Sequence, residues 1–215
     1  MAEFTTEKLL QNFPERTSGP LSVPWEILDE WGPTEHGSKG FTVMIPEMDK
    51  VVLVFTGDYW KEKNLPTETA SLDVLGLEAE CPGCRANSYA LQGYLEAKAA
   101  TNNFEKGMQR WRETGLWWSV TGHGLGGMHS LISALDMGGS RNISKFIHAY
   151  GNPRTMNPAA ANYYNRVFGG DMTEQAYMNN DIFAHQIPAS DEYAHVNTAF
   201  HYLCVSRFLP PPPAG

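Results

Sequence analysis

The chain has 215 residues, of which 42% are hydrophobic and 12% aromatic, and its formal net charge is −8. That length and apolar content fit one globular domain with a sizeable core. The negative charge, with Lys and Arg scattered, excludes an electrostatic surface for nucleic acid, and no apolar run is long enough to be a transmembrane segment.

Residues 1–40 mix Pro, Gly and charged residues, and we expect them to form an N-terminal extension packed on the domain. Trp25, Leu28 and Trp31 recur at helical spacing, which predicts a short helix. The first residues lack the basic start, apolar middle and cleavage site of a secretory signal, so we expect a cytoplasmic location.

The next patterns indicate strands at 41–45 and 51–55, the second of them a buried parallel strand. Residues 59–85 form a long connection, of a length typical of lids and binding loops. The rest alternates helices with strands, with helices predicted at 87–112, 128–137 and 158–168 and strands at 116–121 and 146–150. This order predicts an α/β fold with a mostly parallel central sheet flanked by helices on both faces, followed by a Pro-rich tail at 210–215.

Residues 120–127, Val-Thr-Gly-His-Gly-Leu-Gly-Gly, have the frame of a hydrolase nucleophile turn. In the G-x-S-x-G motif, a serine at a sharp strand-to-helix turn attacks an acyl carbon. Here the serine position is Gly124, which has no side chain that could attack. The frame is therefore present without its nucleophile.

The three cysteines leave several uses open. Cys81 and Cys84 lie in Cys-Pro-Gly-Cys, which could be a redox pair, half of a zinc site or a local disulfide. A zinc site needs about four ligands and the chain has no second pair, so a loop staple or two free thiols is favoured. Cys204 lies in an apolar stretch and is expected in the core, and we expect no metal and no cofactor.

Five segments, in this order along the chain, resemble motifs of fungal class 3 lipases and feruloyl esterases: 51–58, 81–85, 121–127, 150–157 and 180–195. This resemblance implies an α/β-hydrolase fold for residues 41–209. In secreted members of that family, the segment matching 81–85 can hold a short-loop disulfide.

The departures from the family pattern lie on its catalytic groups. The serine is Gly124, and the oxyanion-hole Ser or Thr is Asp58, whose charge would repel an oxyanion. Asn87 replaces a family histidine, and we expect the chain to end before the family's catalytic histidine. Of the Ser-His-Asp catalytic triad of that family, only the aspartate has a counterpart in this chain, Asp181. Replacing any member of such a triad lowers the reaction rate by orders of magnitude. We therefore do not expect a serine-dependent lipase.

Several residues are candidates for a remodelled site. Ser119 and Ser130 flank the turn but are not expected at its tip, and we expect His195 to be structural. His129 and His201 replace apolar or aromatic family positions and are candidates for a new acid or base. We predict Asp58, Asp181 and His201 as catalytic residues, and a substrate-binding set of Tyr59, Trp60, Asn87, Tyr89, His123, Gly124 and Leu125. For His123, a packing role beneath the turn remains the competing interpretation.

Three functions remain open. The first is a repurposed enzyme that performs non-hydrolytic acid/base chemistry, such as cyclisation, isomerisation or elimination, on an apolar small metabolite in a biosynthetic pathway. The second is a catalytically dead protein that binds a lipid or metabolite. The third is a residual esterase in which Asp181 and a relocated histidine activate water. We expect an apolar small-molecule partner, and the sequence does not indicate an oligomeric state.

Overall fold

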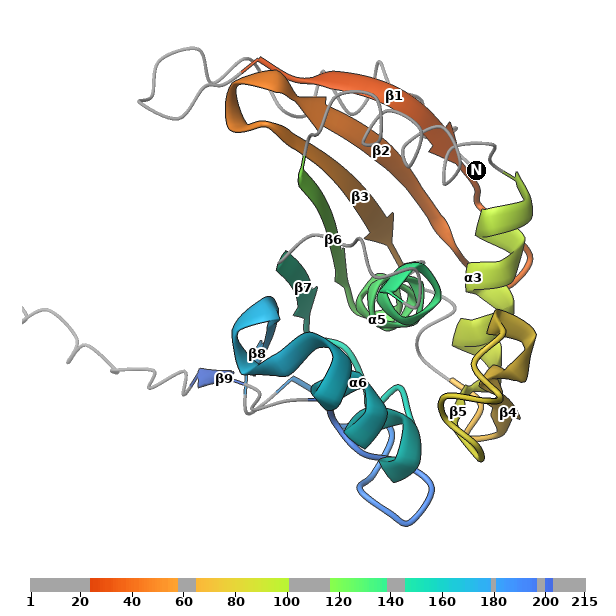
Figure 1. Cartoon of the computed structure of the whole chain (residues 1–215). Coiled ribbons are helices and arrows are strands. Elements are labelled where there is room, and N and C mark those ends of the chain that lie inside the picture. The colour runs from red at the N-terminus through yellow and green to blue at the C-terminus, as the bar shows by residue number, and fades with distance from the viewer. Residues whose placement is uncertain are drawn as a thin grey trace, which may run out of the picture.

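A twisted sheet of seven strands, in the order β1-β2-β3-β6-β7-β8-β9, forms the frame of the molecule (Figure 1). The structure is a computed structural model and describes residues 24–57, 65–100, 117–138, 146–178, 181–196 and 200–202. The strands are β1 (Glu26–Trp31), β2 (Lys39–Ile45), β3 (Lys50–Thr56), β6 (Trp117–His123), β7 (Phe146–Tyr150), β8 (Thr173–Met178) and β9 (Phe200–Tyr202). β1, β2 and β3 pair antiparallel, and the pairs from β3 to β9 are parallel. The predicted α/β class with a mostly parallel sheet is confirmed.

The helix predicted around residues 25–31 is wrong, because these residues form the edge strand β1. The register of β1 against β2 shifts between Ile27 and Asp29, as in a β-bulge. The three apolar residues do not form one buried face, since Trp31 is buried whereas Trp25 leaves 48% of its surface exposed. Trp31 ends the strand with its ring edge-on to Phe55, at 5.2 Å between centroids. β1 thus belongs to the sheet, and the boundary expected at residue 40 falls inside β2.

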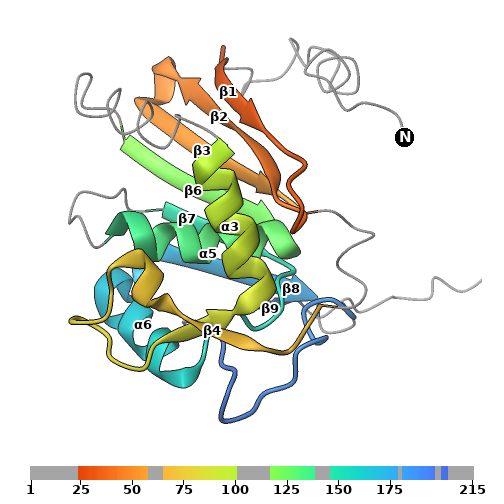
Figure 2. The same ribbon diagram turned by 90° about the vertical axis from the view of Figure 1, so that its right-hand side faces the viewer.

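The three described α-helices, α3 (Ser88–Ala100), α5 (Leu125–Gly138) and α6 (Pro158–Met172), lie on one face of the sheet (Figures 1 and 2). α5 packs on β3, β6 and β7, and α3 packs on α5. The sequence predicted helices on both faces of the sheet, and the helices of the described residues cover one face. Residues 101–112, predicted to continue the first helix, lie outside the described residues.

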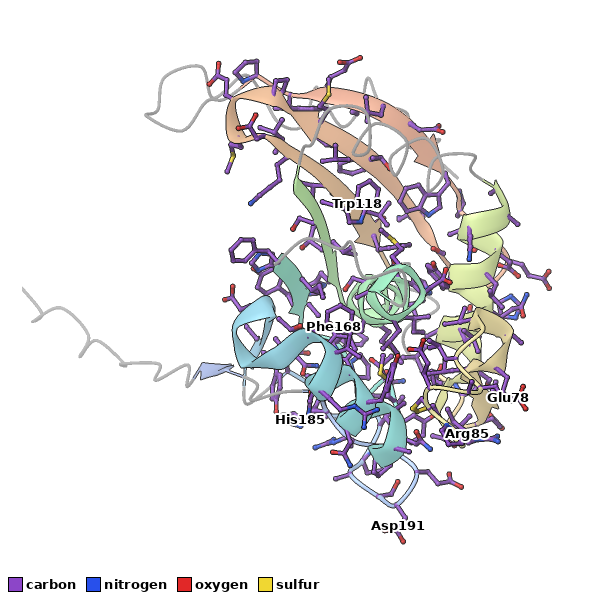
Figure 3. All side chains as sticks on the ribbon, viewed as in Figure 1. Glu78, Arg85, Trp118, Phe168, His185 and Asp191 are labelled. Carbon is purple, nitrogen blue, oxygen red and sulfur yellow. A yellow bond between two sulfur atoms is a disulfide. The ribbon has the colours of Figure 1, made fainter. Side chains whose placement is uncertain are left out.

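The connection between β3 and α3 contains a small ribbon instead of a plain loop. β4 (Thr69–Ser71) pairs antiparallel with β5 (Arg85–Asn87), and the 3-10 helix η2 (Leu72–Leu75) follows β4. A second 3-10 turn, η1 (Pro46–Met48), joins β2 to β3. Figure 3 shows Arg85 on this ribbon, where its guanidinium donates to the Thr69 carbonyl at 2.6 Å.

A disulfide joins Cys81 to Cys84, so the loop staple is the use that the structure gives to this pair. The loop lies against the start of α6. Asn157 caps α6 by accepting from the Ala160 N–H at 3.0 Å, and its Nδ2 donates to the Gly83 carbonyl at 3.0 Å. One side chain therefore fixes both the helix and the disulfide loop.

The core between the sheet and α5 contains one histidine with no polar contact. Figure 3 shows Trp118 inside the curve of the sheet, and it is fully buried. His129 on α5 is also fully buried, and neither ring nitrogen has a hydrogen-bond partner among the described residues. Burial lowers the pKa of His129 from 6.5 to about 3, so the ring stays neutral at ordinary pH.

None of the described helices has both the length and the hydropathy that crossing a membrane requires.

We predict that His129→Leu stabilises the protein by about 1–3 kcal/mol at pH 7, because it removes buried polar atoms that bond to nothing. The unfolded chain binds a proton at this group below pH 6.5, whereas the folded chain binds it only near pH 3. Wild-type stability should therefore fall with acidification across this window, by up to about 1.4 kcal/mol per pH unit from this group. Urea unfolding at pH 5 and pH 7 measures both effects.

His148→Gln is the matched control, because His148 lies on the sheet surface and its Nδ1 is 3.1 Å from Glu174 Oε2. It should keep the wild-type loss of stability between pH 7 and pH 5. If His129→Leu lost as much stability as the wild type between pH 7 and pH 5, the assignment of this pH dependence to His129 would be wrong.

Candidate functional site

The turn between β6 and α5 has the geometry of a nucleophile elbow. β6 ends at His123, Gly124 takes a left-handed backbone angle with φ of 57°, and α5 begins at Leu125. The Gly124 N–H donates to the Tyr150 carbonyl at 2.8 Å, and the Gly124 carbonyl accepts from the Gly127 N–H at 3.0 Å. The predicted strand–turn–helix is confirmed, and residue 124 at its tip is a glycine in a conformation that glycine adopts freely.

Asp181 is held at the same edge of the sheet by its backbone neighbours. Its Oδ1 accepts from the Phe183 N–H at 2.9 Å, at the start of the turn over residues 182–185. A carboxylate with one oxygen fixed in this way keeps the other oxygen in a defined direction. Asp181 Oδ2 has no hydrogen-bond partner among the described residues, and it points toward Gly151.

His123 approaches the same point from the end of β6. A methyl group added at Gly151 would lie 2.9 Å from Asp181 Oδ2 and 3.0 Å from His123 Nε2. The two functional groups therefore share the space over Gly151, although no direct hydrogen bond joins them. His123 is exposed. It does not lie beneath the turn, as the packing interpretation required.

Two other predicted binding residues lie inside the protein. Asn87 is fully buried, and its Nδ2 donates to the Pro66 carbonyl at 2.6 Å and the Tyr193 hydroxyl at 3.1 Å. Its Oδ1 accepts from the Ala90 N–H at the start of α3. Leu125 is fully buried in the core. The described geometry gives both a structural role and offers no support for substrate contact.

Most of the remaining predicted residues lie outside the part of the chain that the structure describes. Asp58, Tyr59 and Trp60 fall outside the described residues, as does Cys204, and their roles stay predictions. His201 is described only as part of the backbone of β9, where it pairs with Tyr177. β7 and β8 separate that strand from β6, which carries the elbow.

A buried polar cluster joins Asn152, the residue after Gly151, to Gln175 and His195. The Gln175 amide nitrogen lies 3.2 Å from Asn152 Oδ1 and 3.1 Å from His195 Nδ1. The His195 ring stacks on Tyr177 at 5.2 Å between centroids. His195 is thus tied into the interior, in line with the structural role predicted for it. Gln175 was missed, because a polar residue in a strand pattern carries no sign of its partners.

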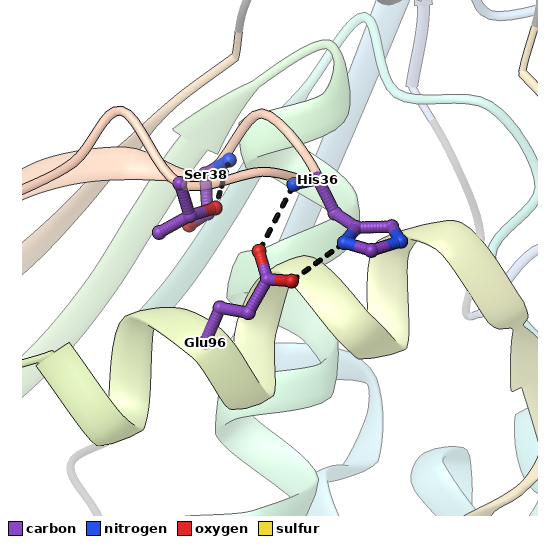
Figure 4. Close-up of polar contacts among 4 residues, drawn as sticks. His36, Ser38 and Glu96 are labelled. Carbon is purple, nitrogen blue, oxygen red and sulfur yellow. Dashed lines mark hydrogen bonds and ion pairs between the residues drawn. The ribbon is translucent and has the colours of Figure 1, made fainter.

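A groove of about 550 Å³ lies between α3 and the β4–η2 segment, and Tyr89 is the predicted binding residue that lines it. At its rim, the His36 backbone N–H donates to Glu96 Oε2 at 2.9 Å, and His36 Nδ1 lies 2.6 Å from Glu96 Oε1 (Figure 4). Burial alone would raise the pKa of Glu96, but the hydrogen bonds from His36 hold it below its usual value. No local pattern predicts this pair, because its members are 60 residues apart.

Comparisons with known proteins point to one family. The family model for class 3 lipases matches residues 52–190. A lipase from Rhizomucor miehei is 34% identical over 86 residues, which are 38% of this chain and 23% of that protein.

Solved lipase structures share the fold. The native Rhizomucor miehei lipase propeptide complex aligns with a TM-score of 0.69 at 21% identity, covering 82% of this chain and 56% of that one. Lip2 lipase from Yarrowia lipolytica aligns with a TM-score of 0.73 at 18% identity, covering 82% and 65%. The chain therefore has the α/β-hydrolase fold of these lipases and spans little more than half of the first one.

We predict that Gly151→Ala destabilises the protein more than Gly76→Ala. Both glycines have positive φ, of 57° and 75°, so both variants carry backbone strain of about 1 kcal/mol or more. A methyl group at Gly76 meets nothing within 4 Å, whereas one at Gly151 meets Asp181 and His123. Urea unfolding measures the difference, and equal losses in the two variants would contradict this placement of the two side chains.

Proposed function

Because the chain belongs to the class 3 lipase family, we propose that it is an enzyme on the lipase fold that performs acid/base chemistry without a serine nucleophile. Its substrate in this proposal is an apolar small molecule of a biosynthetic pathway, and the reaction is a non-hydrolytic proton transfer such as an isomerisation, cyclisation or elimination. The family itself supports an enzyme that acts on an apolar substrate.

One observation carries the proposal: an acid/base pair converges where the nucleophile is missing. Gly124 presents no attacking group at the elbow, while Asp181 Oδ2 and His123 Nε2 converge over the neighbouring Gly151. A carboxylate and an imidazole are the side chains most used for general acid/base catalysis near neutral pH. Removing the serine side chain also leaves room for substrate above the turn.

In the proposed step, Asp181 removes a proton from a carbon next to a carbonyl group, and the electron pair of that bond stays in the substrate. The His123 imidazolium returns a proton to another atom of the substrate. Transfer of the proton from Asp181 to His123 then resets the pair. No covalent intermediate forms, so no nucleophile at position 124 is needed. Asp58 and His201 remain predicted partners in this chemistry.

Two other functions compete with this one. A catalytically dead binding protein would hold an apolar ligand and change nothing. In a residual esterase, His123 and Asp181 would activate water to attack an ester, in keeping with the lipases to which the chain is similar.

The cytoplasmic location expected from the sequence stays a prediction. The Cys81–Cys84 disulfide argues against it, because disulfides persist mainly in oxidising compartments.

An isotope experiment separates the three functions without knowledge of the substrate. The protein is incubated with an apolar metabolite extract in D₂O containing ¹⁸O water, and the extract is compared by mass with one treated with heat-inactivated protein. We expect carbon-bound deuterium in one metabolite, because proton transfer exchanges hydrogen with solvent. Asp181→Asn and His123→Gln should each slow that labelling at least about 100-fold, the usual share of a general acid or base.

The matched control is Asp191→Asn, an exposed carboxylate that is not among the groups nearest Gly151, and it should label at the wild-type rate. Incorporation of ¹⁸O into a carboxylate instead would identify an esterase. Retention of a metabolite without any labelling would identify a binding protein. Either result, or deuterium labelling that survives both site variants, would overturn the proposed function.

A further inference from the structure

The groove beside α3 is lined by apolar and polar side chains, none of which belongs to the elbow. Its floor is apolar, with Leu91 and Leu95 from α3 facing Ala70 and Val74 from the β4–η2 segment. Val74 leaves 63% of its surface exposed. A volume of about 550 Å³ lies in the range of small-ligand pockets.

The contact with Glu96 determines which ring nitrogen of His36 can accept a hydrogen bond from a ligand at the rim of this groove. A carboxylate only accepts hydrogen bonds, so the Nδ1 atom that faces Glu96 Oε1 at 2.6 Å must carry the proton. In the neutral ring, Nε2 then has a free lone pair. Figure 4 shows this second nitrogen pointing away from Glu96. The ring is also positioned by Tyr89, which lines the groove, at 5.0 Å between centroids.

The carboxylates that line the groove or adjoin His36 make this region acidic. Glu68 lines it, and the ligand atoms of Glu35, His36 and Glu96 lie within 4.8 Å of one another at its rim. No Lys or Arg lines the groove in the described part of the chain. The carboxylates at the groove accept hydrogen bonds and carry negative charge, which suits a cationic ligand that donates.

We propose that this groove binds an amphipathic amine, with the alkyl part on the Leu91–Leu95 floor and the ammonium group at Glu68 and His36. An ammonium group has three donors and no acceptor, so it matches the carboxylate and the imidazole lone pair. An ionised donor bound by a carboxylate also forms the stronger kind of hydrogen bond. This site does not depend on the chemistry proposed at Gly124.

The experiment compares three probes with the same alkyl chain, n-octylamine, n-octanol and n-octanoate, by calorimetry and by NMR shifts of the full chain. We expect n-octylamine to bind with shifts confined to the groove residues. The alcohol should bind about tenfold more weakly, and the carboxylate should not bind measurably because it faces like charge.

Glu68→Gln is the decisive variant, because the structural bonds of Glu68 use its backbone carbonyl, which accepts from the Ser88 N–H at 2.9 Å. Its fold should be unchanged, and its affinity for n-octylamine should fall about tenfold. His36→Phe keeps a ring against Tyr89 and removes the lone pair, and it should also weaken binding. Asp191→Asn, an exposed carboxylate outside the groove, should bind as the wild type does.

Equal affinity for all three probes would show a nonspecific apolar surface and overturn the proposal. Wild-type affinity in Glu68→Gln would do the same. Zn²⁺ alone provides the last arm: tight Zn²⁺ binding that Glu35→Gln abolishes, in a protein that does not bind n-octylamine, would assign the rim to a metal and contradict the proposed amine site.

Discussion

The left-handed turn at Gly124 is the constraint on which the site depends. Its N–H is bonded to the Tyr150 carbonyl, so the tip of the elbow is fixed to the end of the neighbouring parallel strand. The turn also needs very close backbone contact, because a methyl group at Gly122 would lie 2.1 Å from the Gly126 carbonyl oxygen. These contacts survive although the residue at the tip carries no side chain. The backbone contacts therefore hold the shape of the turn without a side chain at its tip.

That architecture brings together groups from three segments. The bond to Tyr150 sets Gly151 beside the turn, the end of β6 supplies His123, and the turn after β8 supplies Asp181. Parallel strands end at one edge of the sheet, which is where α/β proteins bind their ligands. The proposed acid/base chemistry needs only this convergence and an empty position 124. The lipase fold can thus support a site from which its usual nucleophile is absent.

The sequence predicted the elbow and Asp181 because both lie in local motifs. It failed at residues 25–31, where apolar residues at helical spacing lie in an edge strand whose partner is β2. It also missed the proximity of His123 to Asp181, which depends on how β6, β7 and the 182–185 turn meet in space. The His36–Glu96 pair was equally hidden, because it joins a strand connection to a helix 60 residues away. Local patterns predict elements, and long-range register decides which side chains meet.

The central claim is that residue 124 takes no part in catalysis and that the side chains around it are not arranged to activate a serine at that position. Labelling of the Gly124→Ser variant with a fluorophosphonate, followed by intact-mass measurement, tests this most directly, with a class 3 lipase that retains its serine as positive control. We expect no adduct on the folded variant, because Asp181 and His123 converge over Gly151 and not over the tip of the turn. Stoichiometric labelling at position 124 would contradict it and would identify a lipase site that lacks only its nucleophile.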